Sequence, residues 1–174
     1  MNLYLRLFLL LLRLIGLPRR GLLEESRVAF RVLPTDCDIN IHMNNGRYLT
    51  FMDLGRVHLM AQLGLIGPIF RRRWKPVLAA ADINFIRPLA PFQKFDLVSR
   101  IVTWDDKYAY MEQRFESSGT LCAHAWVKGL FLGERGRVAN SSVVAEIGYD
   151  GAPPPCPEEL KAWVELGDLK RQKA

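Results

Sequence analysis

One helix-compatible stretch followed by four strand-compatible stretches limits the folds that this chain can adopt. Between residues 46 and 63, apolar residues recur at helical spacing, and Gly64, Gly67 and Pro68 end the pattern. The four strand-like segments are 77–89, 94–106, 107–117 and 120–133. Asp-Asp and Ser-Ser-Gly junctions between some of them favour antiparallel hairpins. We therefore predict an α+β domain in which one antiparallel sheet wraps around one long central helix.

Two glycines lie within the predicted central helix, at Gly46 and Gly55. Each weakens an isolated helix by up to ~1 kcal/mol relative to alanine, and close packing of the helix on a sheet would explain their presence. Asn44 or Asn45 is the expected N-cap, because an asparagine side chain can accept a hydrogen bond from the first helical turn. The helix therefore begins directly after a polar loop.

The segments on either side of this region are less regular. Residues 26–34 alternate apolar and polar side chains and predict a strand that ends at a proline. Residues 137–150 are compatible with a last short strand or with a turn of helix. Four prolines within residues 153–157 predict a stiff connection, and two glutamates then open a short helix over residues 158–163.

The first seventeen residues are apolar except for Asn2, Arg6 and Arg13. As a helix they would be roughly 25 Å long, which is marginal for a bilayer span. The two arginines are seven residues apart and fall on nearly the same helical face, which is typical of a helix that lies in the headgroup layer. Arg13 also interrupts the apolar core that a cleaved signal peptide needs.

We divide the chain into an N-terminal apolar helix at 1–18 and a single domain at 19–174. The helix anchors the protein to a membrane surface or packs on the protein's own core. If the segment did span a bilayer, the basic residues that follow it would hold the domain on the cytoplasmic side. The expected location is therefore the cytoplasmic side, with peripheral membrane attachment.

Composition sets further limits on the class of protein. The 174 residues, 49% hydrophobic, suffice for one well-cored domain. Three cysteines at wide spacing form neither a disulfide framework nor a zinc pattern, which favours a reducing compartment. A net charge of +6 favours anionic partners. The basic runs lack interleaved aromatic residues apart from Trp74, so nucleic acid is not an expected partner.

The stretch DCDINIHMNN, residues 36–45, concentrates two carboxylates, three amides and one imidazole directly before the central helix. Its first three oxygen donors match a calcium-binding loop, but Ile41 and Arg47 occupy the glycine and glutamate positions of that pattern. We therefore expect neither a metal nor a cofactor. The chain also lacks a G-x-S-x-G elbow, a P-loop and a G-x-G-x-x-G turn, and the functions built on those motifs lose their support.

This loop fits acyl transfer from a thioester. The leaving thiolate has a conjugate acid of pKa ~8.5 and departs without a strong general acid, so one carboxylate can suffice. Asp38 could attack the carbonyl directly or deprotonate a water that attacks it, and the residues do not separate these routes. Backbone N–H groups at the start of the following helix would stabilise the oxyanion. Asp36 is expected to shape the turn.

The stretch D-C-D-I-N-I-H-M-N-N-G-R-Y resembles the signature D-x-D-x-N-x-H-x-N-N-x-x-Y of hotdog-fold acyl thioesterases of the 4-hydroxybenzoyl-CoA thioesterase type. The resemblance extends from about Arg27 through Gly133. The leucine-rich N-terminus is similar to that of membrane-associated members of the superfamily. The fold that this implies is a hotdog fold with an added N-terminal helix. The matching residues are Asp38, Asn40, His42, Asn44, Asn45 and Tyr48.

The resemblance also implies roles for individual residues. It assigns the nucleophile or base to Asp38, and the related carrier-protein thioesterases add Asn40 and His42 to the catalytic set. His42 could instead brace the loop. Plant members carry a further acidic or cysteine group on a later strand, where this chain has residues 106–108 and no clear counterpart. A third catalytic group is therefore unassigned.

The implied assembly is a homodimer, or a dimer of dimers, whose sheets join side by side with each active site at the interface. Asn45 and Tyr48 are candidate substrate-binding residues, although both could simply fix and pack the start of the helix. CoA phosphates would bind basic surface residues, and a merely solvated or lipid-facing loop is the alternative. The candidates for this role are Arg71, Arg72, Arg73 and Lys75.

The resemblance and the loop together predict hydrolysis of an acyl-CoA to free acid and CoA. Two other functions remain open. One is a noncatalytic protein that binds acyl chains or lipid at a membrane surface. The other is an acyl-thioester hydratase or dehydratase, in which an Asp/His pair moves protons at carbon.

Overall fold

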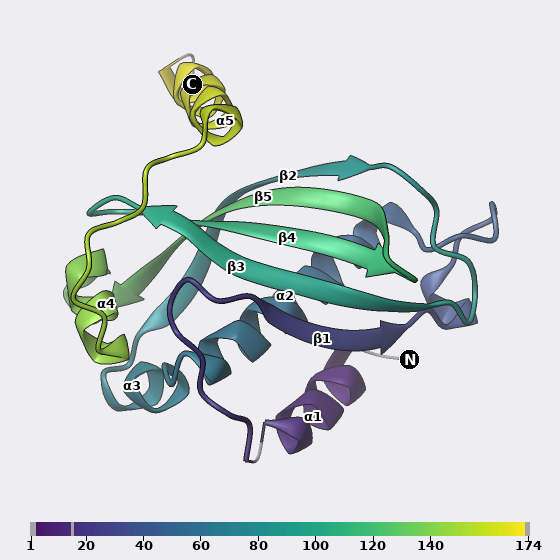
Figure 1. Ribbon diagram of the computed structural model, residues 1–174, viewed down its shortest axis with the longest axis horizontal. Coiled ribbons are helices and arrows are strands. Elements are labelled where there is room, and N and C mark those ends of the chain that lie inside the picture. Colours follow the sequence, from purple (N-terminus) through teal and green to yellow (C-terminus); the bar gives the residue numbers. More distant parts are fainter. Residues whose placement is uncertain (1–2, 15, 173–174) are drawn as a thin grey trace.

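The computed structural model describes residues 3–14 and 16–172 (Figure 1). Its elements follow the predicted order of a strand, a loop, a long helix and a run of strands. They are α1 (Leu3–Arg13), β1 (Ser26–Arg31), the 3-10 turn η1 (Pro34–Asp36), α2 (Asn45–Gln62), α3 (Ile66–Arg71), β2 (Lys75–Phe85), β3 (Lys94–Trp104), β4 (Ala109–Ser117), β5 (Thr120–Gly133), β6 (Gly136–Val138), α4 (Asn140–Ile147) and α5 (Glu158–Gln172).

The strands form one antiparallel sheet in the order β1-β3-β4-β5-β2, and β6 pairs with β5 outside this path. The register aligns one apolar row across the sheet: Val28, Leu97, Phe115, Ala123 and Phe85 stand opposite one another on successive strands. The first four of these side chains are buried. Because opposite residues share a face, this row lies on the side of the sheet that packs against α2.

Figure 1 shows the curved sheet on one side of α2, as the sequence predicts. The inward side chains of α2 are apolar and almost fully buried, with Tyr48, Phe51, Met52 and Leu54 each at most 2% exposed. The ring of Phe51 meets that of Phe95 edge-on, at a centroid distance of 5.1 Å. This burial of large apolar side chains is the main source of stability for the domain.

Gly55 lies where α2 comes closest to the sheet. A Cβ at this position would stand 2.5 Å from Cδ2 of Leu97, 2.9 Å from Nε2 of Gln113 and 3.0 Å from Oγ of Ser99. Gln113 is fully buried, and its Nε2 donates hydrogen bonds to the Met52 carbonyl and the Ser99 hydroxyl. The expectation that close packing explains this glycine is confirmed.

The N-terminal helix α1 lies beside α2 and β1 (Figure 1), and Leu10 joins the core. Arg6 is 6% exposed and binds the buried carboxylate of Asp36, whereas Arg13 is exposed. The prediction that both arginines face the headgroup layer is therefore wrong for Arg6, because a buried carboxylate in the loop pairs with it. Outward-facing apolar side chains of the helix are Tyr4, Leu5, Phe8, Leu9, Leu11 and Leu12. Within the described ranges, no helix is long and apolar enough to cross a membrane.

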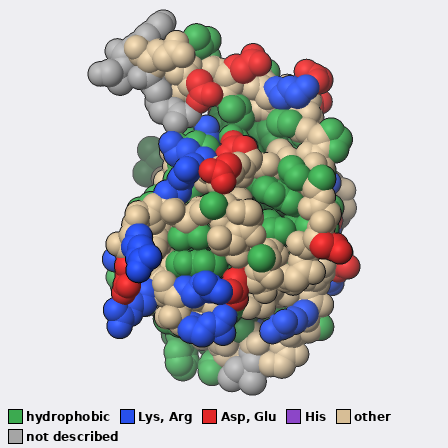
Figure 2. All heavy atoms as spheres, turned by 90° about the vertical axis from the view of Figure 1, so that its left-hand side faces the viewer, with side chains coloured by type: hydrophobic (Ala, Val, Ile, Leu, Met, Phe, Trp, Pro, Cys, Tyr) green, Lys and Arg blue, Asp and Glu red, His purple; other side chains and the backbone are tan. Residues whose placement is uncertain are grey.

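Three segments differ from the sequence-based expectations. Gly64, at φ +73°, ends the α2 region, but the chain resumes as α3 because Pro68 falls within its first turn, where proline is tolerated. Residues 136–147 contain both a short strand and a helix, β6 and α4. The last helix continues well beyond residue 163, and its Leu160 is buried with Tyr110 and Val102. Figure 2 shows the end of the molecule that carries α3 and α4, with Lys and Arg side chains gathered along one side.

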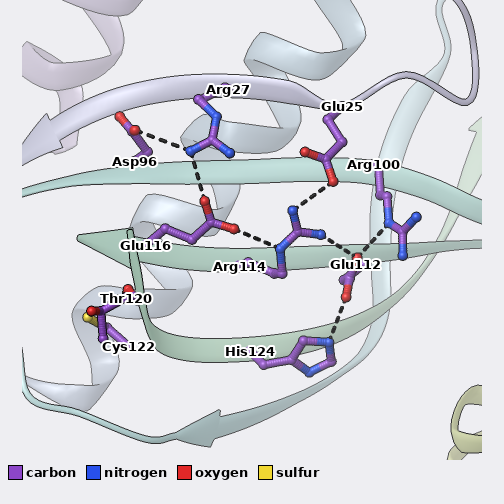
Figure 3. Close-up of polar contacts among 10 residues, drawn as sticks. All are labelled: Glu25, Arg27, Asp96, Arg100, Glu112, Arg114, Glu116, Thr120, Cys122 and His124. Carbon is purple, nitrogen blue, oxygen red and sulfur yellow. Dashed lines mark hydrogen bonds and ion pairs between the residues drawn. The ribbon is translucent and has the colours of Figure 1, made fainter. Parts of the chain in front are cut away.

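The sheet face opposite α2 carries a network of ion pairs (Figure 3). Glu112 is central: it accepts hydrogen bonds from Arg100 at 2.6 Å and Arg114 at 2.8 Å, and lies 2.9 Å from Nε2 of His124. Burial alone would raise the pKa of Glu112, but these hydrogen bonds and the arginine charges lower it to about 2. Arg114 also binds Glu25 and Glu116, so the network ties β3, β4 and β5 to the segment before β1.

Replacing Gly55 with alanine is expected to lower the free energy of unfolding by about 1–3 kcal/mol, because the added methyl group overpacks the contact with Leu97. Gly167 provides the matched control. It lies in the interior of α5, and a methyl group added there would meet no side chain and no other element within 4 Å, so Gly167→Ala should raise stability by up to ~1 kcal/mol. Urea unfolding measures the free energy of unfolding of both variants and of the wild type. Equal stabilisation by the two substitutions would contradict the packing.

Candidate functional site

The loop before α2 is a tight hairpin. Cys37 and Met43 form an isolated antiparallel bridge, and the Asp38 N–H donates to the His42 carbonyl at 3.1 Å. The Ile41 N–H donates to the Asp38 carbonyl at 3.0 Å, which closes a turn over the intervening residues. Ile41 adopts φ +59°, an unfavourable conformation for a β-branched residue. The surrounding hydrogen bonds therefore hold the loop in a strained shape at the position of the candidate site.

Asp38 is half-buried within this hairpin. Its Oδ1 accepts a hydrogen bond from the Asn40 N–H at 2.9 Å, the pattern of an Asx turn. This bond orients the carboxylate of Asp38. The side chains of Asn40 and His42 are exposed on the same hairpin.

Asn44 is the N-cap of α2, which resolves the choice between the two asparagines. Its Oδ1 accepts the Gly46 N–H at 2.9 Å, and its backbone carbonyl accepts the Arg47 N–H at 2.8 Å. The Asn44 N–H donates to the Asp36 carbonyl at 2.9 Å. The helix start is thus attached directly to the acidic loop.

A cavity of about 290 Å³ lies where the loop, the start of α2 and the end of β2 meet. It brings together five predicted site residues: Asp38, Asn40, His42, Asn45 and Tyr48. The remaining lining residues are Met43, Phe85, Ile86, Arg87 and Pro88. Arg87 supplies a cation at this cavity that the sequence did not mark as functional, because only the fold brings the end of β2 beside the loop.

Tyr48 forms the inner wall of this cavity. It is 2% exposed, and its ring lies 4.9 Å from that of Phe85 and 4.8 Å from that of Phe115, measured between centroids. Burial raises the pKa of Tyr48 to about 12, with a smaller contribution from Cys122, so the phenol is neutral at physiological pH. Tyr48 therefore packs the start of α2 onto the sheet and also borders the site.

The predicted phosphate-binding residues lie elsewhere. Arg71 and Arg72 pair with Glu146 of α4, Arg73 pairs with Glu134, and all three line a basic cavity of about 620 Å³. Arg135 and Arg137, which the sequence did not mark as functional, also line it. Lys75 begins β2, whereas the Asp38 cavity lies at the other end of that strand.

Eleven residues of extended β2 span roughly 35 Å. Within one chain, the structure therefore does not bring the arginines to Asp38.

A third cavity, which is apolar and has a volume of about 340 Å³, lies between the later turns of α2, the first residues of β2 and α4. Its walls are almost entirely apolar and include Met60, Val77 and Val144. Asp53 and Arg56 are the charged groups among its described lining residues, and they pair with each other. Sequence alone did not reveal this cavity, because its lining comes from six separated elements.

The outer edge of β2 is exposed between these sites. Three consecutive small residues, Ala79, Ala80 and Ala81, are exposed at its middle, and Leu78 and Phe85 are 42% and 47% exposed. No group of three or more potential metal-ligating side chains that could hold an ion occurs among the described residues.

Comparison with known proteins identifies the class of this arrangement. The model of a thioesterase-like superfamily matches residues 32–164. "Protein THEM6" of Drosophila melanogaster is 32% identical over 142 residues, which cover 79% of this chain and 71% of that protein. "Probable thioesterase YBR096W" of Saccharomyces cerevisiae is 32% identical over 99 residues, which cover 55% of this chain and 43% of that protein.

Solved structures show the same fold. The probable thioesterase YbaW from Escherichia coli superposes with a TM-score of 0.65 at 18% identity, over 70% of this chain and 94% of that one. The BH1999 gentisyl-coenzyme A thioesterase superposes with a TM-score of 0.60 at 21% identity, over 69% of this chain and 98% of that one. With its sheet curved around α2 and the family match across most of its length, the chain belongs to the thioesterase-like superfamily and has the hotdog fold.

Proposed function

We propose that this protein hydrolyses acyl-CoA thioesters to a free acid and CoA, with Asp38 as the nucleophile or general base. Family membership supports thioester hydrolysis in general. The observation that carries the assignment to Asp38 is the cavity at the start of α2, which Asp38 lines together with Asn40, His42 and the first helical residue. A thioester carbonyl bound in this cavity would lie beside both the carboxylate and the helix terminus.

The oxyanion is best stabilised by the backbone N–H of Asn45. The first turn of a helix carries N–H groups without intrahelical partners and has the positive end of the helix dipole. Here the Gly46 N–H is bound by the Asn44 side chain and the Arg47 N–H by the Asn44 carbonyl. Of the N–H groups at the start of α2, we therefore assign the oxyanion hole to that of Asn45, a residue that lines the cavity.

Hydrolysis follows one of two routes at this site. Asp38 attacks the carbonyl carbon to form a mixed anhydride and expel the CoA thiolate, and water then releases the acid. Alternatively, Asp38 takes a proton from the water that attacks the carbonyl. In both routes the developing negative charge falls on the carbonyl oxygen. Asn40 and His42 serve as polar contacts to the thioester, since both line the cavity.

The complete site requires a dimer formed through β2. The exposed small residues at the middle of this edge strand allow a second copy to approach closely and extend the sheet. A symmetric antiparallel pairing centred near Ala80 would place Phe85 of one chain beside the partner's Lys75. Light scattering on the purified protein measures this assembly directly.

In that dimer, the Asp38 cavity of one protomer adjoins the apolar cavity and the arginines of the other. The apolar cavity then holds the acyl chain, and the basic cavity binds the CoA phosphates. Arg71, Arg72 and Arg73 already have carboxylate partners in the isolated chain, so phosphate would compete with Glu146 and Glu134 for them. This arrangement unites residues that a single chain keeps apart.

A noncatalytic acyl-chain binder is the second candidate. It is favoured by one observation: within a single chain, the apolar cavity lies along later turns of α2 and shares no lining residue with the Asp38 cavity. Such a protein would retain acyl-CoA without turnover.

We also propose that α1 attaches the protein to the cytoplasmic side of a membrane surface. Its outward face carries six exposed large apolar side chains, including Phe8 and Leu12. A groove beside the helix contains the cations Arg13, Arg31 and Lys94, which suit anionic lipid headgroups. The helix would lie in the interface with its inner face still packed on the domain.

Substituting Asp38 with asparagine is expected to reduce kcat for acyl-CoA hydrolysis by about 10²–10⁴-fold, because the amide neither attacks the carbonyl nor accepts the proton from water. Free-thiol detection across a series of acyl chain lengths measures the loss, and circular dichroism verifies the fold. Asp150→Asn, at an exposed loop position, serves as the control and should retain activity. Turnover by Asp38→Asn at the wild-type rate would rule out the proposed mechanism.

Replacing Leu12 with glutamate should lower binding to phosphatidylserine-containing vesicles by tenfold or more, because a charge replaces an inserted apolar side chain. Leu166→Glu on α5 is a matched control, since Leu12 and Leu166 are 50% and 51% exposed. Vesicle co-sedimentation compares the variants. The membrane proposal fails if the wild type does not bind vesicles or if both variants bind equally well.

A further inference from the structure

Asp36, the first aspartate of the acidic loop, is buried at the junction of three elements. Its side chain is 2% exposed, and a buried carboxylate is stable only when its charge is paired and its oxygens are hydrogen-bonded. Oδ2 accepts the Leu33 N–H at 2.9 Å and binds Arg6 of α1. Oδ1 lies 3.5 Å from Nε of Arg47 on the first turn of α2. One carboxylate therefore links η1, α1 and α2.

Arg6 is the principal partner in this link. Its side chain is 6% exposed, and its guanidinium lies over the ring of Phe51, 4.5 Å from the centroid. It also donates to the Arg31 carbonyl at 3.5 Å. Because the guanidinium contacts an α2 core ring, the end of β1 and the loop carboxylate, α1 is fastened to the domain by a charged group as well as by leucine packing.

The backbone transmits this anchoring to Asp38. The Asp36 carbonyl accepts the Asn44 N–H, and the next residue, Cys37, forms the bridge to Met43. Asp38 follows immediately, with its N–H bound to the His42 carbonyl. The buried Asp36 and the candidate nucleophile are thus two residues apart on one hydrogen-bonded hairpin. A shift of Asp36 therefore moves Asp38 relative to the helix start.

We propose that Asp36 is a positioning residue for Asp38 and that Arg6 of α1 holds Asp36 in place. The N-terminal helix therefore contributes to the geometry of the active site. The ion pair fixes the base of the hairpin at the N-terminus of α2 and keeps the Asp38 carboxylate in register with the Asn45 N–H. The inference rests on the proposed function for the role of Asp38. The coupling of α1 to the loop rests on the contacts alone.

The test replaces Arg6 with methionine, which keeps an unbranched side chain of similar length but removes the charge and the donors. Arg20→Met, at an exposed arginine that pairs with Glu24 and does not contact the loop, is the matched control. Hydrogen exchange of the Asp38, Ile41 and Asn44 amides reports the loop, and exchange of β4 amides reports the whole fold. Steady-state kinetics with acyl-CoA report the effect on the reaction.

In Arg6→Met, we expect the three loop amides to exchange at least about tenfold faster while the β4 amides are unchanged. The value of kcat should fall about 100-fold, and KM should stay within a few-fold of the wild type. Displacing a catalytic group weakens the stabilisation of the transition state more than it weakens the binding of the substrate. Arg6→Lys keeps the charge without the planar fork, so its loop exchange rates and its kcat should lie between those of the wild type and those of Arg6→Met. It also preserves the test if the methionine variant does not fold.

Loop exchange and kcat that match the wild type in both Arg6 variants would overturn the proposal. So would a parallel loss of protection in the loop and in β4, which would indicate general destabilisation. A wild-type protein without hydrolase activity, in which Arg6→Met still accelerates exchange in the loop alone, would contradict the proposed function while supporting the coupling of α1 to the loop.

Discussion

The packing of α2 against the sheet is the contact on which the rest of this structure depends. Gly55 lets the helix backbone approach Leu97 and the buried amide of Gln113, and that amide ties the helix to β3 and β4. Once the helix axis is fixed in this way, its N-terminus and its later turns must lie at opposite ends of β2. The positions of the Asp38 cavity, the apolar cavity and the basic cavity follow from this one contact.

That geometry explains why the chain carries its functional groups in separate places. The N-terminus of α2 carries the strained hairpin and the Asp38 cavity, whereas the later turns of the helix line the apolar cavity. A single chain thus keeps the proposed reacting end apart from the proposed acyl-binding end. An exposed edge strand with small residues at its centre offers the means to join them between two copies. The proposed mechanism and the proposed dimer are therefore one hypothesis.

Local patterns predicted the central helix and the four long strands after it, because periodicity and turn chemistry define these elements, whereas α3, β6 and α4 were not predicted. The central helix, predicted over 46–63, occupies Asn45–Gln62, and the predicted sequence of a strand, a loop, a long helix and several long strands along the chain is confirmed. Of the predicted site residues, those of the motif line the Asp38 cavity, whereas the predicted basic residues at 71–75 do not. Features that depend on long-range contacts were missed. Arg6 turns inward because Asp36 lies buried thirty residues away, and Arg87 reaches the site only through the course of β2.

Subunit complementation tests the central claim, hydrolysis at Asp38 with the acyl chain held by the partner, most directly. Asp38→Asn would be mixed with Ala109→Trp, which fills the apolar cavity from its β4 wall. Each homodimer should be inactive, and refolding the two together should restore roughly a quarter of wild-type activity, because half of the dimers are mixed and each has one intact composite site. No recovery in demonstrated mixed dimers would contradict the account.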